Sequence, residues 1–453
     1  MDYKKAISEL NSKLFEKKEK LTTEEVLEIK KIIHELNVAS FEMQKNIMEF
    51  RRIADYNNLL DEGFDFEFLK ECYKEDNQTI SDAEEKLEIH KHFNRTMMFG
   101  YPANMQKDSG VISYLRFLES KMYLMNNCGD AYHPGNYRMS NGEAELRIIE
   151  EVKNNLKLNS DKYWGYINSG GTEGNFWGLR EGGAQFPNSV IYCSKAAHYS
   201  VSKFLEMYGK AEVEVISEVD GAINKEELFE KISSYYNKDK KAAILLLTCG
   251  TTALGSVDDV ECIKNWLISN KIPHYIHLDA AMYGGIPNNQ EKSPTKELFD
   301  KLNDLNIDSI SISLHKYIGN HKVNGILLAQ KQSVDNFIDY IGQKDISILG
   351  SRDIAPFSTL QRIVELYKRT APNEYYRNVE YFEKLLKENN ISYIKGHEFG
   401  NTFVIDEPSD EVCKKFQLAT FKYNDKPSAH IIIFPYHTEK SMGELVEAIK
   451  TKK

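Results

Sequence analysis

The apolar positions of the first 90 residues recur at helical spacing. Ile7, Leu10 and Leu14 are three or four residues apart, and this stretch contains no proline and a single glycine, Gly63. Such spacing gathers apolar side chains on one face of an α-helix. We therefore expect residues 1–95 to form a helical segment. Its apolar stripe carries no catalytic motif, which favours a packing or dimerisation surface over a site.

The hydrophobic pattern changes at Gly100. From there, short runs rich in β-branched and apolar residues alternate with longer amphipathic stretches. Because this alternation is typical of strands separated by helices, we predict a mostly parallel sheet covered by helices, an α/β domain, over residues 96–350. The predicted strands are 164–168, 190–193, 212–216, 242–249, 275–279, 309–314 and 325–329, and the predicted helices include 198–208, 225–236 and 260–270.

The last hundred residues show a third pattern, in which one long helical stretch is followed by short strand-like runs. This mixture predicts a smaller C-terminal α+β domain over residues 351–453. The chain is thus expected to have three parts, consistent with its length of 453 residues. The predicted elements are a helix from 356 to about 389, strands at 392–395, 402–405 and 430–434, and helices around residues 412 and 445.

Composition and charge narrow the class of protein. Apolar residues make up 41% and charged residues 28% of the chain, as in ordinary globular proteins. The 58 basic and 68 acidic side chains give a net charge of −10 without a basic patch, which argues against nucleic-acid binding. The longest apolar run, 242–249, is far shorter than the roughly 20 residues of a membrane helix, and the N-terminus is too charged for a signal peptide. We therefore expect a cytoplasmic protein without membrane association.

The six cysteines give no sign of a metal site. They are scattered along the chain, and none forms a CxxC pair or a CxxH cluster. Structural zinc sites need closely paired ligands, so reduced and mostly buried thiols are the favoured interpretation, and we expect no metal.

A glycine-rich turn at 168–175, Asn-Ser-Gly-Gly-Thr-Glu-Gly-Asn, is the strongest local signal. It follows a predicted strand and opens a helix. Glycines let the backbone approach an anion closely, and the free N–H groups of a helix N-terminus favour a phosphate. The turn lacks the spacing of the common nucleotide fingerprints, so a simple tight turn remains the alternative.

Two further strand ends carry reactive side chains. Asp279, in the sequence His-Leu-Asp-Ala-Ala at 277–281, follows an apolar strand, where a buried carboxylate needs a positive partner unless it only caps the next helix. Lys316, in Ser-Leu-His-Lys at 313–316, follows another strand. Burial there would lower its pKa and free the amine to form a Schiff base, whereas an isolated lysine usually faces solvent.

Together these signals point to one cofactor. A phosphate site, a carboxylate for a pyridinium nitrogen and an imine-forming lysine are what pyridoxal phosphate requires. His198 follows a further strand, and its flat ring could lie against the ring of the cofactor. As a lone histidine it would more often be a core or surface residue.

The ordered succession of motifs resembles the group II pyridoxal-phosphate-dependent amino-acid decarboxylases, in particular the branch of bacterial histidine decarboxylases and plant-type serine decarboxylases. The resemblance covers about four fifths of the chain. The matching segments are 99–104 (Phe-Gly-Tyr-Pro-Ala-Asn), 127–130, 171–175, 198–201, 250–252, 257–259, 277–281, 315–316, 350–352 and 416–419.

The resemblance implies a homodimer of fold-type I that decarboxylates an L-amino acid. It implies that Lys316 holds the cofactor covalently, that His198 stacks on the cofactor ring and that Asp279 pairs with the pyridinium nitrogen. Tyr340 is the candidate for a mobile-loop residue near the proton transfer, although a plain surface tyrosine is the alternative. The other cofactor residues would be Ser169, Gly170, Gly171, Thr172, Thr248, Thr251, Ala281, Ser313 and His315, and the substrate residues Tyr101, His133, Arg138, Ser351 and Arg352.

Three loops expected near the substrate depart from the family pattern, at 135–140, 320–325 and 350–355. Histidine is the leading substrate because the most similar branch uses it. The alternatives are serine, methionine or a branched aliphatic amino acid, an aldehyde-forming oxidative deamination, or a catalytically retired fold that serves as a binding protein.

Overall fold

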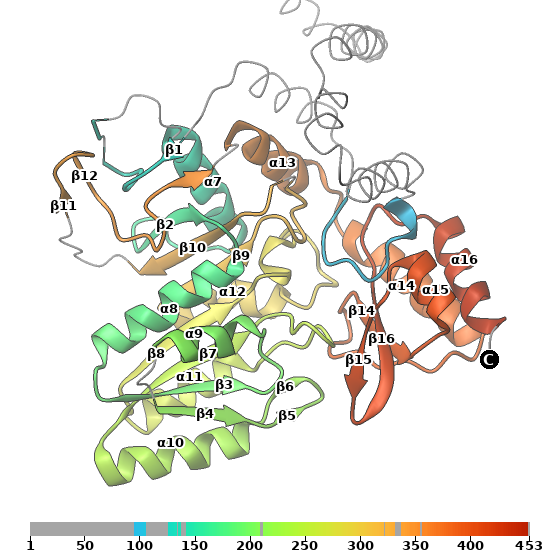
Figure 1. Cartoon of the computed structure of the whole chain (residues 1–453), viewed down its shortest axis with the longest axis horizontal. Helices are drawn as coiled ribbons and strands as arrows, with labels where there is room; N and C mark the ends of the chain where they lie inside the picture. The colour runs from blue at the N-terminus through green and yellow to red at the C-terminus, as the bar shows by residue number, and fades with distance from the viewer. Residues whose placement is uncertain are drawn as a thin grey trace, which may run out of the picture. The chain divides into compact units, whose positions relative to one another are not determined.

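A seven-stranded sheet forms the centre of the structure (Figure 1). The strand order is β2-β10-β9-β8-β7-β3-β4, and neighbours are parallel except at β10, which runs antiparallel to β2 and β9. The computed structural model describes residues 95–105, 126–133, 135–136, 142–208, 212–320, 322–330, 337–353 and 356–451, with the side chains of 353, 356–358 and 361 left aside. The strands are β2 (Tyr163–Asn168), β3 (Ser189–Ser194), β4 (Glu212–Ile216), β7 (Ala242–Thr248), β8 (His274–Asp279), β9 (Ser309–Ser313) and β10 (Gly325–Gln330).

Helices cover both faces of this sheet. The strand β7, Ala-Ala-Ile-Leu-Leu-Leu-Thr, is buried along its whole length, as expected for a parallel strand between two helical layers. On one face, α8 and α9 pack against β3, β7 and β8. On the other, α7 and α12 share a core with the isoleucines of β9. The helices are α7 (Gly142–Asn155), α8 (Gly171–Gln185), α9 (Ser200–Tyr208), α10 (Lys225–Asp239), α11 (Val260–Ser269) and α12 (Lys296–Leu305).

A second, smaller layer follows at the C-terminus. Its antiparallel sheet has the order β14-β16-β15, with β14 (Thr402–Asp406), β15 (Ala419–Tyr423) and β16 (Lys426–Ile432). The helices are α14 (Glu374–Glu388), α15 (Asp410–Phe416) and α16 (Glu439–Lys450). We call these six elements the C-terminal layer. The mostly parallel sheet and the smaller α+β part predicted from the sequence are both confirmed.

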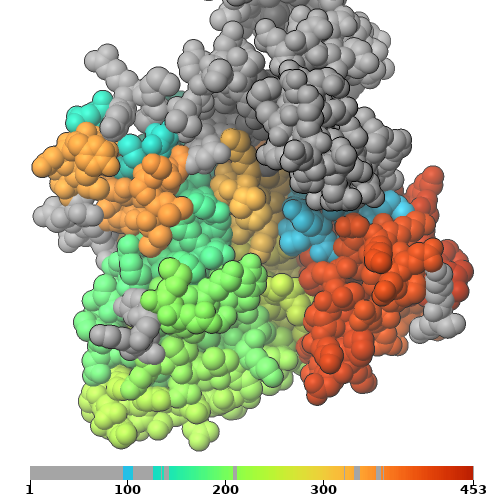
Figure 2. Space-filling model, viewed as in Figure 1, coloured from blue at the N-terminus to red at the C-terminus, as the bar shows by residue number. Residues whose placement is uncertain are grey.

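The C-terminal layer packs directly beside the large sheet domain, as the red and green parts of Figure 2 show. The Tyr317 ring lies 5.8 Å from Tyr375 and 6.0 Å from Phe434, measured between centroids. One hydrophobic core runs through both parts. Short elements complete the chain: η1 (Arg95–Met97), η2 (Tyr283–Gly285), and the pairs β1 (Asn126–Asn127) with β13 (Arg352–Asp353), β5 (Glu218–Val219) with β6 (Ala222–Ile223) and β11 (Phe337–Ile338) with β12 (Gln343–Lys344).

The structure corrects two predicted elements. The single helix predicted for 356–389 is divided into α13 (Pro356–Arg369) and α14, because Pro372 cannot continue a helix and Asn373 adopts a left-handed φ of 62°. The strand predicted at 392–395 is reduced to one bridge between Ile394 and Val404.

Other predictions about the domains are not tested. The helical segment predicted for residues 1–95 lies outside the described residues except at its last position. The domain boundary at 350 stays a prediction, and α13 just beyond it packs against α7. None of the helices within the described ranges is long and apolar enough to cross a membrane.

Candidate active site

Lys316 lies in the turn that follows β9. Its backbone N–H donates to Ser313 O (3.3 Å), and its carbonyl accepts from the Asn104 N–H (2.8 Å). The Asn104 side chain also donates to Tyr317 O (3.1 Å), so the segment 95–105 holds this turn from outside the sheet. Burial lowers the pKa of the Lys316 amine, and the Asp279 carboxylate opposes part of that shift. The amine is therefore closer to its neutral, nucleophilic form than that of an exposed lysine.

Asp279 ends β8, where it is paired in register with Thr248 at the end of β7. One carboxylate oxygen, Oδ2, accepts from Asn175 Nδ2 (2.7 Å), and the other, Oδ1, accepts from the Ala281 N–H (3.0 Å). The buried hydroxyl of Thr248 has no hydrogen-bond partner among the residues that the structure describes. A buried polar atom without a partner is costly, so a polar group of a bound molecule would fit beside it.

His198 lies between β3 and α9. Its Nδ1 is 2.9 Å from Ser200 Oγ, which fixes the orientation of the ring. Burial lowers the pKa of His198, Lys316 lowers it further, and Asp279 raises it. His198 is thus near enough to the amine and to the carboxylate to be influenced by both, although the three residues follow three separate strands.

The N-terminus of α8 lies beside the Lys316 turn and has no side-chain cap. Its N-cap residue, Gly170, has a φ of +131°, and the Gly171 N–H donates to Ser313 Oγ (3.2 Å). A Cβ on Gly171 would lie 2.8 Å from Ser313 Oγ and 3.2 Å from Ala281 Cβ, and one on Gly170 would lie 3.6 Å from the His315 ring. These close approaches form a small cradle at a helix N-terminus, where the dipole favours a phosphate.

Three more predicted cofactor residues surround this cradle or the end of β7. Ser169 and Thr172 are exposed at the start of α8. Thr251 is buried, and its Oγ1 accepts from the Ser256 N–H (2.9 Å), so its hydroxyl oxygen stabilises the turn after β7.

Most of the predicted substrate and loop residues lie on exposed segments. Tyr101 is half exposed, and Tyr340 is 75% exposed on the β11–β12 hairpin. Ser351 Oγ accepts from an asparagine side chain on β1. The exposed His133 ring lies 3.0 Å from Asp130 Oδ2. Arg138 lies outside the described residues.

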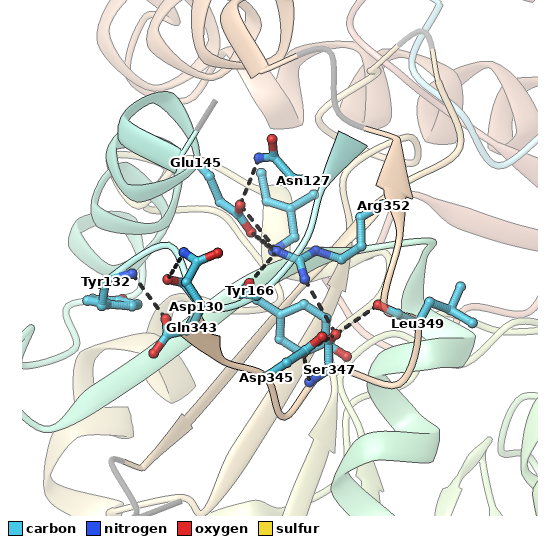
Figure 3. A network of polar contacts seen from close by, with 12 residues as sticks. Asn127, Asp130, Tyr132, Glu145, Tyr166, Gln343, Asp345, Ser347, Leu349 and Arg352 are labelled. Carbon is cyan, nitrogen blue, oxygen red and sulfur yellow. Dashed lines mark hydrogen bonds and ion pairs between the residues drawn. The ribbon is translucent and has the colours of Figure 1, made fainter. Parts of the chain in front are cut away.

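Arg352 occupies a buried polar network instead of an open surface (Figure 3). Its guanidinium lies 3.4 Å from Glu145 of α7, donates to Gly129 O (3.0 Å) and stands over the Tyr166 ring at 5.3 Å. The Tyr166 hydroxyl in turn donates to Glu173 (3.0 Å) in the first turn of α8. The network thus connects β13 with the helix that forms the cradle.

Comparison with known proteins gives the family. The model of the pyridoxal-dependent decarboxylase conserved domain matches residues 185–387. The histidine decarboxylase of Klebsiella aerogenes is 31% identical over 361 residues, which are 77% of this chain and 90% of that protein. Serine decarboxylase 2 of Oryza sativa subsp. japonica is 32% identical over 370 residues, 78% of this chain and 74% of that protein. The chain belongs to the pyridoxal-dependent decarboxylase family.

Solved structures of decarboxylases share the fold. The L-methionine decarboxylase of Streptomyces sp.590 superimposes with a TM-score of 0.70 at 17% identity, over 83% of this chain and 95% of that chain. The tryptophan decarboxylase of Catharanthus roseus gives a TM-score of 0.61 at 16% identity, over 79% and 82%. The decarboxylase therefore has the fold-type I architecture, as predicted.

This chain is a pyridoxal-phosphate-dependent amino-acid decarboxylase of group II, and its site fits that cofactor. The start of α8, which has no side-chain cap, would suit the phosphate, and Lys316 would supply the amine. The Thr248 hydroxyl, which has no partner among the described residues, would suit a polar group of the cofactor. When bound, pyridoxal phosphate accepts the electron pair that the departing carbon dioxide leaves on the substrate. The described residues contain no group of three or more histidine, cysteine or acidic side chains that could hold a metal ion.

Sequence reasoning missed three residues that shape this decarboxylase site. Asn175 bonds directly to Asp279, Asn104 holds the Lys316 turn, and Ser200 orients His198. All three lie in motifs that the sequence singled out, but no role followed from residue type alone. For Asn175 a signal existed: it stands among regularly spaced glycines at the start of a helix, where a helix approaches its neighbour closely.

Proposed function

We propose that Lys316 binds pyridoxal phosphate covalently, that Asp279 holds the proton on the ring nitrogen and that His198 lies against the face of the ring. The observation that carries this proposal is that Asp279 ends β8 and Lys316 follows the adjacent parallel strand β9, where the N-terminus of α8 meets Ser313. A carboxylate beside the ring nitrogen favours its protonated form, and a neutral amine is needed for the covalent bond. In this proposal the phosphate lies at the N-terminus of α8, beside Gly171 and Ser313.

We propose a polar amino acid as the substrate, with histidine first and serine second. Histidine decarboxylases and serine decarboxylases match this chain at 29–34% identity. A pocket built from polar groups would leave those groups unpaired against an aliphatic side chain, at a cost of roughly 1–3 kcal/mol each. Among the predicted substrate residues, Tyr101, His133 and Ser351 remain the candidates that are exposed.

We also propose that the active form is a homodimer. Support comes from the resemblance to the family, in which loops of one subunit complete the site of the other, and from the exposed position of Tyr340 on its hairpin. The cytoplasmic location expected from the sequence stays a prediction.

A substrate panel tests this function. Purified protein with pyridoxal phosphate is incubated separately with histidine, serine, methionine, valine, leucine and aromatic amino acids, and the initial rates of carbon dioxide and amine release are compared. We expect histidine to react fastest. A tenfold or greater preference for an aliphatic substrate would contradict the polar pocket.

A chemical label tests the position of the cofactor independently of the substrate. Borohydride reduction of the loaded protein followed by peptide mapping should place the label on Lys316, and Lys316→Ala should remain unlabelled. A label on another lysine would overturn the assignment.

A further inference from the structure

Behind Asp279, a continuous chain of hydrogen bonds crosses the buried interior of the sheet. The Tyr275 hydroxyl donates to Ser309 Oγ (2.9 Å), and Ser309 Oγ lies 2.7 Å from His277 Nδ1. On the other side of the ring, His277 Nε2 lies 3.0 Å from Asn175 Oδ1. The chain ends where Asn175 Nδ2 meets Asp279 Oδ2 at 2.7 Å. All five side chains are buried.

The chemistry of the Asn175 amide fixes the direction of this chain. Its NH₂ group must face the Asp279 carboxylate, which can only accept, so its carbonyl oxygen faces His277. His277 must then donate from Nε2, and its Nδ1 accepts from Ser309. Burial lowers the pKa of His277 to about 4, so the ring is neutral near pH 7 and has the single proton that this arrangement needs. Every donor in the chain therefore points toward Asp279.

Two regular spacings, one along β8 and one along α8, bring Asn175 into contact with His277 and Asp279. Alternate residues of a strand share a face, so Tyr275, His277 and Asp279 of β8 lie on one face. His277 is in register with Ser309 of β9, and Asp279 with Ser311. Above them, α8 presents a glycine every fourth residue. A Cβ on Gly174 would overlap Ser311, and one on Gly178 would overlap the His277 ring. The helix can carry Asn175 down to the sheet only because these positions lack side chains.

A second donor reinforces the Asn175 carbonyl. Ser311 Oγ lies 2.5 Å from Asn175 Oδ1, so the oxygen accepts from both Ser311 and His277. The amide is thus held on its oxygen side by two donors and has one strong acceptor on its nitrogen side. Hydrogen bonds in such a chain polarise one another, and the bond to the carboxylate is a strong, directional one that fixes where its oxygens lie.

We propose that Asn175 and His277 are positioning residues that hold the Asp279 carboxylate in the orientation that meets the ring nitrogen of the cofactor. This inference rests on the proposed function, in which Asp279 is the partner of that nitrogen. Neither residue touches the reacting atoms, and both act through Asp279. Their loss should therefore weaken the hold on the ring proton as well as slow decarboxylation.

The test uses loaded full-length enzyme with four variants. His277→Phe removes both ring nitrogens, whereas His277→Gln keeps an amide that can donate to Asn175. Ser309→Ala removes the donor to His277 Nδ1 but leaves the bonds from His277 to Asn175 and from Asn175 to Asp279 in place. Tyr163→Phe is the matched control. It deletes a buried hydroxyl of β2 that donates to the Ile307 carbonyl (2.8 Å) and takes no part in this series of hydrogen bonds. Thermal unfolding of each variant reports folding, and Ser309→Ala and His277→Gln keep the test valid if His277→Phe does not fold.

Two readouts separate positioning from general damage. The first is the ¹⁵N chemical shift of cofactor labelled at the ring nitrogen, which reports its protonation. We expect the shift to move toward the unprotonated value in His277→Phe, less in Ser309→Ala, and to stay at the parent value in Tyr163→Phe. The second is kcat, expected to fall about tenfold in His277→Phe and to recover to within threefold of the parent in His277→Gln.

A double-mutant cycle decides whether these effects pass through Asp279. In an Asp279→Asn background, His277→Phe should change kcat less than twofold. An equal loss in both backgrounds, or an unmoved ¹⁵N shift in His277→Phe, would overturn the inference. If Asp279→Asn itself alters neither the ¹⁵N shift nor kcat, the proposed role of Asp279 fails, and the inference fails with it for that separate reason.

Discussion

At the residue scale, two environmental effects act on Lys316 in opposite directions. Burial disfavours the charged ammonium and lowers its pKa, while the Asp279 carboxylate favours the charge and raises it. The net pKa is below that of an ordinary lysine, so the neutral amine is available at lower pH. Because the neutral form attacks the cofactor aldehyde, the capture of pyridoxal phosphate should reflect this pKa directly.

We expect apoprotein to capture pyridoxal phosphate with a rate that rises with pH and reaches half its maximum below the ordinary lysine pKa. Asp279→Asn removes the effect that raises the pKa, so its midpoint should lie lower still. Stopped-flow absorbance of the cofactor between pH 6 and 10 measures both midpoints. A midpoint at or above that of free lysine, or an upward shift in Asp279→Asn, would contradict this account.

Individual residues differ in how far the sequence could place them. Asp279 and Lys316 were predictable because the carboxyl ends of parallel strands meet at one edge of a sheet, so residues 37 positions apart converge. Arg352 was not, because its partner Glu145 is 207 residues away and neither residue type distinguishes a buried ion pair from a substrate contact. The sequence showed that Arg352 needs a polar or charged partner, but which partner it contacts depends on tertiary packing.

At the element scale, the approach of α8 to the sheet depends on the glycines that face it. Gly178→Ala adds a methyl group that overlaps the His277 ring, and the buried ring cannot move away cheaply. We expect a loss of about 1–3 kcal/mol in the free energy of unfolding, measured by urea denaturation of the apoprotein.

Gly443 of α16 provides the matched control for that substitution. A Cβ there would meet nothing within 4 Å, so Gly443→Ala gains only helix propensity. It should stabilise the protein by about 0.5–1 kcal/mol. If Gly178→Ala and Gly443→Ala changed the free energy of unfolding in the same direction, helix propensity rather than close packing would determine the effect at Gly178.

The Arg352–Glu145 pair joins β13 to α7 and allows a second test of structure against substrate binding. The two side chains are only 3% and 1% exposed, so removal of one partner leaves a buried charge. We expect Arg352→Ala to lower the free energy of unfolding by about 3–5 kcal/mol, measured by urea denaturation. A raised KM with unchanged stability would instead support the substrate role predicted from the sequence.

A surface ion pair serves as the control for Arg352. Lys368 and Glu151 lie 2.6 Å apart with the lysine side chain 58% exposed. Lys368→Ala should cost less than about 1 kcal/mol, because solvent already screens this pair. The contrast isolates burial as the source of the Arg352 effect.

Some elements were easier to predict than others for physical reasons. The strand β7 could be predicted from its long apolar run, because both of its faces are buried. In β9, Ser-Ile-Ser-Ile-Ser, serines face α8 and isoleucines face the opposite core. That alternation would be typical of a half-exposed strand, although every residue of β9 is buried. Only the glycines of a distant helix reveal why the polar face can be buried.

At the scale of the whole molecule, the proposed homodimer has a functional test. Lys316→Ala and Tyr340→Phe homodimers should each be nearly inactive, and mixing them with subunit exchange should restore roughly a quarter of the parent activity if Tyr340 acts across the interface. Size-exclusion chromatography and a tagged subunit confirm the exchange. Demonstrated exchange without any recovery would place Tyr340 in the same subunit's site or outside it.

Tyr317, the neighbour of Lys316, packs against Tyr375 of α14 and against Phe434, which follows β16. The peptide that carries the Lys316 amine therefore also contacts the C-terminal part of the fold. A cofactor that holds this peptide in place lowers the entropic cost of packing the C-terminal part against it. By thermodynamic linkage, that packing also favours binding of the cofactor. We therefore expect cofactor loading to slow amide hydrogen exchange in α14, although that helix takes no part in the site.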